Sequence, residues 1–151
     1  MQIDNSLNIK VKRLTETAKL PEYQSPASAG CDLHADISAP ITIGAGERML
    51  IPTGIAIEPA SNNVGIFLFA RSGLASKHGI TLSNSVGVVD ADYRGEIKLS
   101  LVNLSDVPYT LTPGERVAQL VVMPVIRATF SEADTLGDTQ RGEGGFGHSG
   151  K

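Results

Sequence analysis

Two carboxylates and a phenol are displayed together in one short turn of the chain. Asp90, Asp92 and Tyr93 fall within 87–97, which reads GVVDADYRGEI. A plain two-residue hairpin favours Asn-Gly or Asp-Gly, whereas here Gly95 comes only after these side chains. In an extended segment, residues two apart point to the same side, so both carboxylates would face one way. Such a pair suits magnesium, although a solvated acidic turn is the simpler interpretation.

The end of the chain mixes glycine with one arginine and one phenylalanine. Gly142, Gly144 and Gly147 have the spacing of a dinucleotide-binding fingerprint, but that motif needs a strand before it and a helix after it. Composition alone favours a disordered tail. However, glycines let backbone N–H groups approach a phosphate, Arg141 offers a charged planar fork, and Phe146 offers a face that can stack on a base.

Two polar segments in the middle of the chain have a functional and a simpler interpretation. Arg71, Ser72 and Gly73 follow an apolar run and open a helix candidate at 74–78. Free N–H groups at a helix start suit an anion, yet an ordinary capped turn with a surface arginine is the simpler interpretation. The amide of Asn84 can donate and accept, which matches the edge of uracil, yet a turn asparagine would look the same.

The histidines and the cysteine show no catalytic or metal pattern. His34, His78 and His148 are far apart and lack zinc-type spacing. A single cysteine, Cys31, excludes an internal disulfide and fits a reducing compartment. We expect these four side chains to have structural roles or to lie on the surface.

Five segments, in order and spacing, closely resemble the five motifs of the trimeric deoxyuridine triphosphate nucleotidohydrolases (dUTPases). The resemblance runs from near residue 20 to the C-terminus, and five motifs in order are far more specific than one. The segments are 29–33 (AGCDL), 71–80 (RSGLASKHGI), 87–97, 114–120 (GERVAQL) and 141–147 (RGEGGFG).

The resemblance implies hydrolysis of dUTP to dUMP and diphosphate, which keeps uracil out of DNA and supplies dUMP for thymidylate synthesis. Asp90 would be the general base that takes a proton from the attacking water. Mg²⁺ would be bound to the triphosphate, and Asp32 would make water-mediated contacts near that metal. Two alternatives are a dCTP deaminase-like enzyme of the same fold and an inactive nucleotide-binding regulator. The sequence from Asp90 to Tyr93 looks like the hydrolase, and the retained Asp90 and intact tail argue against a regulator.

The same resemblance assigns roles to the other candidates. Tyr93 would pack under the deoxyribose and leave no room for a 2′-hydroxyl. His148 stands in a His-Ser pair where the family more usually has Ser-Thr, so part of the γ-phosphate contact differs. The implied substrate contacts are Asn84, Val88, Val89 and Lys98 for the base, Arg71, Ser72, Gly73 and Gln119 for the triphosphate, and Arg141, Phe146, Gly147 and Ser149 in the closing tail.

Short β-type segments must position these residues. Their number and the regular turns between them favour a sandwich or barrel, and the resemblance makes this an all-β, jelly-roll-like distorted β-barrel subunit with a mobile glycine-rich C-terminal arm. Residues 1–130 would form the core and 131–151 the arm. In 96–103, Ile97, Leu99 and Leu101 alternate with polar residues, as in a half-buried strand. The expected strands are 9–13, 41–43, 48–57, 65–69, 96–103, 109–111, 116–123 and 127–130.

The run 117–123 is apolar except for Gln119. A strand that is apolar on both sides must be covered on both sides, either as a central strand or by an oligomer interface. The resemblance implies a homotrimer.

Charge and hydropathy exclude other classes of partner. The net charge is −3 without a basic block, so we expect no nucleic-acid groove. No apolar stretch approaches the ~20 residues that cross a bilayer, and the N-terminus lacks a signal-peptide pattern. We expect a cytoplasmic protein without a membrane partner.

Overall fold

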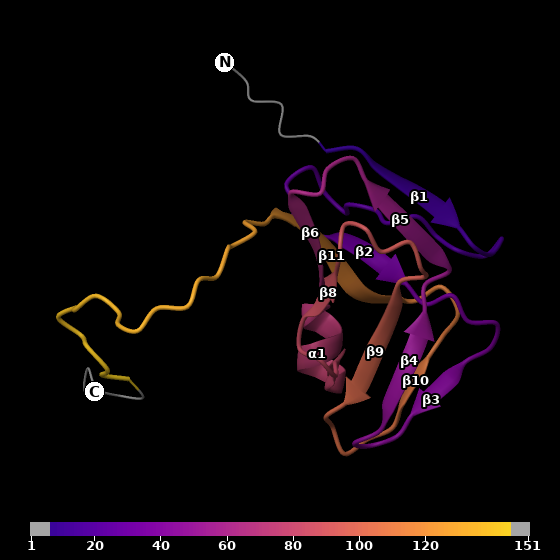
Figure 1. Cartoon of the computed structure of the whole chain (residues 1–151). Coiled ribbons are helices and arrows are strands. Elements are labelled where there is room, and N and C mark those ends of the chain that lie inside the picture. Colours follow the sequence, from indigo (N-terminus) through magenta and orange to yellow (C-terminus); the bar gives the residue numbers. More distant parts are fainter. Residues whose placement is uncertain (1–6, 146–151) are drawn as a thin grey trace.

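The computed structural model describes residues 7–145, and its body is built almost entirely of antiparallel strands (Figure 1). Most of the short segments expected from the sequence are present, and the all-β prediction is confirmed. The strands are β1 (Ile9–Arg13), β2 (Cys31–His34), β3 (Ile41–Ile43), β4 (Arg48–Pro52), β5 (Ile55–Pro59), β6 (Val64–Ala70), β7 (Ile80–Leu82), β8 (Gly87–Val89), β9 (Lys98–Asn103), β10 (Tyr109–Leu111) and β11 (Arg116–Pro124); the helix is α1 (Ser72–His78).

Two larger sheets enclose the core. One has the order β2-β11-β6-β8 and the other the order β4-β9-β7, while β1-β5 and β3-β10 form two-stranded pairs. Leu33 and Ile66 from the first sheet share one buried cluster with Ile51, Leu99 and Leu101 from the second. The alternation expected in 96–103 is thus used to bury one face of β9 against the opposite sheet.

The single strand expected over 48–57 is wrong, because the chain turns at Gly54. Gly54 has a φ of +66°, a left-handed conformation that glycine adopts without a steric cost. Its amide donates to Glu96 Oε1 at 2.9 Å, and the Thr53 hydroxyl donates to the Ile97 carbonyl at 2.6 Å. The break therefore ties β4 and β5 to the segment that leads into β9.

The strand expected over 127–130 is also wrong. The Val125 amide donates to the Asn63 carbonyl at 2.9 Å, and from Ile126 onward the chain runs away from the body as an exposed segment (Figure 1). The segment 127–130 has residues of high β-propensity, but within 7–145 it pairs with no strand. Conversely, the sequence interpretation missed β2, β7 and β8, which have four, three and three residues.

The apolar strand β11 is central in its sheet, between β2 and β6. Its first half is buried apart from Arg116 and the half-buried Gln119, whereas Val121, Val122 and Met123 remain half-buried. The central position of β11 therefore explains the apolar residues of its first half. The half-buried residues of its second half leave apolar surface that this chain does not cover completely.

The helix α1 begins two residues earlier than expected. Arg71 precedes it in an extended conformation, and Gly79 ends it with a φ of +68°, the left-handed cap typical of helix ends. Leu74 is its buried residue. No helix in the described part of the chain is long and apolar enough to cross a membrane.

Candidate active site

A pocket of about 390 Å³ opens beside the segment that joins β8 to β9. It brings together Asn84, Val88, Val89, Lys98 and Tyr93, which were expected to contact the base and sugar, and the expected general base Asp90. We call it the base pocket. Its lining residues are Leu50, Leu68, Asn84, Gly87, Val88, Val89, Asp90, Tyr93, Glu96, Ile97 and Lys98.

The loop after β8 is a turn, so the expected extended segment is wrong, although both carboxylates do line one cavity. The Tyr93 amide donates to the Asp90 carbonyl at 3.1 Å, and the Arg94 guanidinium donates to the Ala91 carbonyl at 2.7 Å. Asp90 and Asp92 both line a second pocket, whereas only Asp90 also lines the base pocket.

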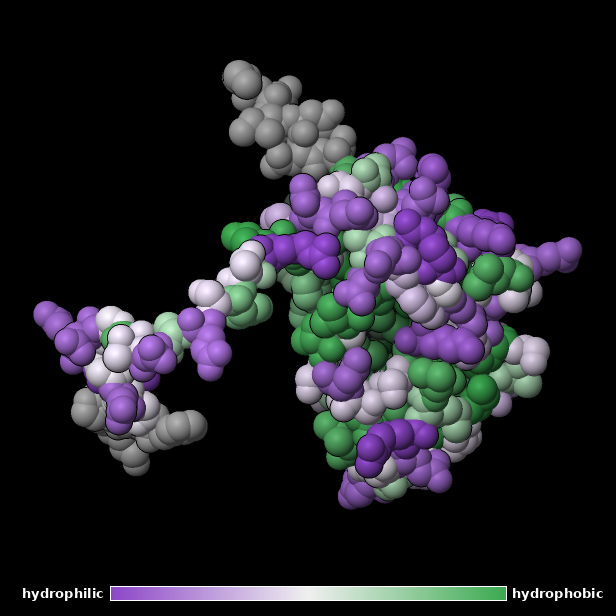
Figure 2. Space-filling model, viewed as in Figure 1, coloured by the Kyte–Doolittle hydropathy of each residue, from purple (hydrophilic) through white to green (hydrophobic). Residues whose placement is uncertain are grey.

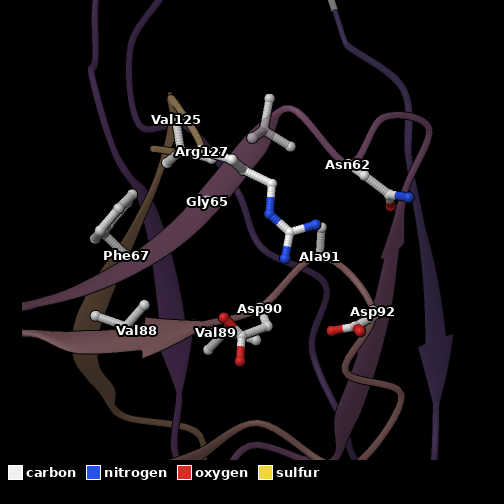
Figure 3. A pocket seen from close by; sticks show the side chains of 11 residues that line it. Asn62, Gly65, Phe67, Val88, Val89, Asp90, Ala91, Asp92, Val125 and Arg127 are labelled. Carbon is white, nitrogen blue, oxygen red and sulfur yellow. The ribbon is translucent and has the colours of Figure 1, made fainter. Parts of the chain in front are cut away.

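That second pocket, of about 440 Å³, lies between the start of β6 and the residues after β11. Figure 3 shows the Arg127 side chain extending into it, toward the loop that carries Asp90 and Asp92. Asp90 is thus accessible from two cavities.

The polar side chains of the base pocket hold one another in place. The Tyr93 hydroxyl donates to the Glu96 carbonyl at 3.0 Å, and Lys98 Nζ lies 3.5 Å from Glu96 Oε2. The sequence interpretation missed Glu96, because an acidic residue at the start of a strand carries no distinguishing pattern.

The wall of the base pocket is apolar and open to solvent. Val88 is 65% exposed and Leu50 is 59% exposed, so both present apolar surface that the fold itself leaves uncovered. Such surface suits a planar aromatic ligand. The sequence interpretation missed Leu50. This apolar residue of β4 lies outside the core, and that exposure is the feature that could have pointed to it.

A second group gathers three predicted residues and one further arginine around a buried carboxylate, and we call it the Asp32 cluster: Asp32, Arg71, Gln119 and, in addition, Arg116. Asp32 is 1% exposed. Its carboxylate lies 3.3 Å from Arg71 Nε and 3.1 Å from Arg116 Nη1, and Gln119 Nε2 donates to it at 3.4 Å. A buried carboxylate needs such partners. Two guanidiniums against one carboxylate leave a net positive charge that suits phosphate.

Arg116 was not among the expected site residues, although it lies within the segment 114–120. Arg71 Nη1 also donates to the Arg116 carbonyl at 3.0 Å, so the two arginines are held as a unit. Both remain accessible, because their side chains are 27% and 43% exposed. Ser72 and Gly73 follow Arg71 at the exposed start of α1.

The carboxylates do not form a metal cage. Within 7–145 no group of three or more His, Cys, Asp and Glu side chains could hold an ion. Both oxygens of Asp32 are already engaged by arginines. Magnesium commonly binds through one or two carboxylates together with substrate phosphates. The residues therefore fit a metal that arrives on a triphosphate.

Asp32 and the β8 wall of the base pocket lie at opposite edges of one sheet. Asp32 is on β2 and Val88 is on β8, with β11 and β6 between them. Three strand spacings of about 4.8 Å separate the two edges by roughly 14 Å. Gln119 is on β11 and Arg71 directly follows β6, so the Asp32 cluster extends from β2 toward the middle of the sheet.

The described part of the expected arm, 131–145, makes local contacts. Arg141 Nε donates to the Gly144 carbonyl at 2.6 Å, and the Gly142 amide donates to Thr139 Oγ1 at 3.0 Å. Figure 1 shows this segment extending away from the body, and Arg141 is not among the residues that line the base pocket. Phe146, Gly147, His148 and Ser149 lie outside the described residues.

The cysteine and the two described histidines have environments that suit structural roles. Cys31 is buried, and this burial raises the pKa of its thiol, which disfavours the reactive thiolate. The His78 ring lies 5.0 Å from the Tyr109 ring. His34 is half-buried at the end of β2.

An apolar pocket for a planar base and guanidiniums for phosphates define a nucleotide-binding enzyme on an all-β scaffold. Comparison with known proteins makes this specific. A family model described as dUTPase matches residues 16–150. The chain belongs to the dUTPase family.

The relatives cover nearly the whole chain. A protein from Desulfitobacterium hafniense, named deoxyuridine 5′-triphosphate nucleotidohydrolase, is 47% identical over 148 residues, covering 97% of this chain and 98% of the relative. A protein of the same name from Shewanella oneidensis is 48% identical over 150 residues, covering 99% of each. A solved structure of the Staphylococcus bacteriophage 80alpha dUTPase with dUPNHPP has a TM-score of 0.86 at 25% identity, covering 95% of this chain and 99% of that one. The jelly-roll-like fold is thereby confirmed.

Proposed function

We propose that this chain hydrolyses dUTP to dUMP and diphosphate in the base pocket, with Asp90 as the general base. Family membership over residues 16–150 carries this proposal, and Asp90 at the rim of a pocket with Asn84 and Tyr93 supports it. The reaction keeps uracil out of DNA and supplies dUMP for thymidylate synthesis. A dCTP deaminase-like activity or an inactive regulator is not favoured by relatives named as hydrolases.

Recognition of the base and sugar uses groups that line the pocket. The Asn84 amide, which can donate and accept, reads the edge of uracil, together with the backbone of Val88, Val89 and Lys98. The ring of Tyr93 packs under the deoxyribose and excludes a 2′-hydroxyl.

The chemical step is an attack by water on the α-phosphorus. A bond forms from the water oxygen to phosphorus, the bond from phosphorus to the bridging oxygen breaks, and diphosphate leaves. Asp90 accepts the water proton, which is the role of a positioned general base.

The triphosphate lies against Arg71, Ser72, Gly73 and Gln119. Mg²⁺, when it is bound to the triphosphate, would neutralise its charge. Asp32 would help through water-mediated contacts near the metal, and its carboxylate also pairs with Arg71 and Arg116. It also holds Arg71 in place.

The active protein is a homotrimer in the cytoplasm, and the arm 131–151 closes over bound nucleotide. The position of Asp32 at the sheet edge opposite the base pocket supports an active site completed between chains. The substrate contacts of the arm are Arg141, Phe146, Gly147 and Ser149.

Product analysis tests the activity. Purified protein with magnesium should release diphosphate from dUTP and no ammonia from dCTP. Ammonia from dCTP would favour the deaminase, and binding of dUTP without diphosphate release would favour the regulator.

A further inference from the structure

Gly95 lies against the aromatic ring that faces the sugar. A Cβ atom placed on Gly95 would lie 2.5 Å from Cζ and 2.9 Å from Cε2 of Tyr93, and closer still to its hydroxyl oxygen. Contacts this short do not occur between real atoms, so any side chain at position 95 would displace the ring.

The ring is held from its other end by a hydrogen bond. The Tyr93 hydroxyl donates to the Glu96 carbonyl at 3.0 Å. Residue 96 is itself anchored, because its Oε1 accepts from the Gly54 amide at 2.9 Å. The neighbouring Ile97 carbonyl accepts from Thr53. The Tyr93 ring thus packs against the backbone of Gly95, and its hydroxyl donates to the Glu96 carbonyl.

The backbone conformation does not explain the glycine. Among the described residues with positive φ are Gly46, Gly54, Gly79, Gly114 and Gly142, but not Gly95. Alanine could adopt the local conformation of position 95 without strain. What the glycine provides there is space for the Tyr93 ring.

We propose that Gly95 is a positioning residue that determines sugar specificity, because its missing side chain sets the place of the Tyr93 ring. The inference rests on the proposed function, in which that ring excludes a 2′-hydroxyl. A ring pushed away from residue 95 loses the hydrogen bond to the Glu96 carbonyl and no longer lies where the fold holds it. The preference for dUTP over UTP should then fall.

The experiment compares kcat/KM for dUTP with kcat/KM for UTP in parent, Gly95→Ala, Tyr93→Ala and the double variant. Tyr93→Ala should lower this ratio on the order of tenfold, the scale of a single steric contact. Gly95→Ala should lower it in the same direction by a comparable factor. The double variant should match Tyr93→Ala within about twofold, because residues acting through one contact are not additive.

Gly65→Ala is the matched control. A Cβ at Gly65 would also meet an aromatic ring, lying 2.7 Å from Cε2 of Phe67, but both residues line the second pocket and neither is an expected substrate contact. It should lower the melting temperature without changing the substrate ratio. If Gly95→Ala alone fails to fold, the double variant should fold like Tyr93→Ala, because the clashing ring is gone.

The outcomes separate the two proposals. An unchanged ratio in Gly95→Ala beside a lowered ratio in Tyr93→Ala would overturn the role of Gly95 and leave the proposed function intact. A double variant that loses more than Tyr93→Ala, or that fails to fold, would also overturn it. An unchanged ratio in Tyr93→Ala would refute the sugar role itself, and absence of dUTP hydrolysis in the parent would refute the proposed function.

Discussion

At the scale of single residues, the turn after β8 gives Asp90 and Asp92 different surroundings, although their side chains are identical. The hydrogen bond from the Tyr93 amide to the Asp90 carbonyl closes the turn. Only Asp90 then lines the base pocket. We therefore assign the base to Asp90 alone.

Asp90→Asn should keep the fold and dUTP binding but lose turnover. Asparagine has a similar shape but cannot accept the water proton, and losing a positioned base typically costs on the order of 10²–10⁴-fold in rate. Steady-state kinetics and dUTP binding check this. Asp92→Asn is the matched control and should lose far less. Near-normal turnover in Asp90→Asn would rule out this residue as the base.

His34 makes the stability of the fold depend on pH. Burial lowers its pKa below the ordinary 6.5, Lys19 and Arg116 lower it further, and Asp32 and Glu22 oppose the shift. Its Nδ1 is buried without a hydrogen-bond partner. Since the unfolded chain binds this proton more tightly, the neutral side chain contributes stability that is complete above about pH 6.5 and is lost as the pH falls below it.

Replacing His34 by asparagine should flatten this response. The melting temperature of the parent should fall between about pH 7 and pH 5, where an ordinary histidine titrates, and that of His34→Asn should fall less. Calorimetry at several pH values measures the difference. Equal slopes would show that other groups control the acid response.

At the scale of elements, the C-terminal arm has a glycine-rich composition that the local contacts of its described residues do not explain. Its described residues up to Glu143 are exposed, and ordering them around a substrate costs conformational entropy that new contacts must offset. Closure would also exclude bulk water from the reaction.

Removing the chain after Thr139 should spare the fold and cripple turnover. The truncated protein should melt like the parent, because the arm makes local contacts. Trypsin should cut the intact arm at Arg141 in free protein, and a non-hydrolysable dUTP analogue with magnesium should protect it. Full activity after truncation, or equal cleavage with and without analogue, would contradict closure.

At the scale of the whole molecule, the surface includes apolar side chains that one chain cannot cover. Ile126 and Phe130 are 97% and 92% exposed, and the C-terminal half of β11 is half-buried. Figure 2 shows apolar residues among the polar ones on the visible face of the body and on the segment that leaves it. A second copy of the chain is an economical cover.

Light scattering after size exclusion should report the mass of three chains. Because the proposed site is completed between chains, dilution that separates the chains should also reduce turnover. Full activity in a monomeric sample would disprove the shared site.

Local patterns in the sequence determined much of this protein. Alternation in 96–103 predicted β9, since every second residue of a strand faces the core. The five motifs predicted the family, and the resemblance pointed to several residues that line the base pocket. These signals succeed because side-chain chemistry and short-range periodicity are written in neighbouring residues.

Tertiary structure decided the rest. The break at Gly54 is stabilised by Glu96, more than forty residues away, and three-residue strands such as β8 exist only because β6 lies beside them. The pairing of Arg116 with Asp32 and the contact of the Tyr93 ring with Gly95 likewise depend on how the chain is folded. Such features were hidden in the sequence because their energies come from contacts between segments rather than from the residues of one segment.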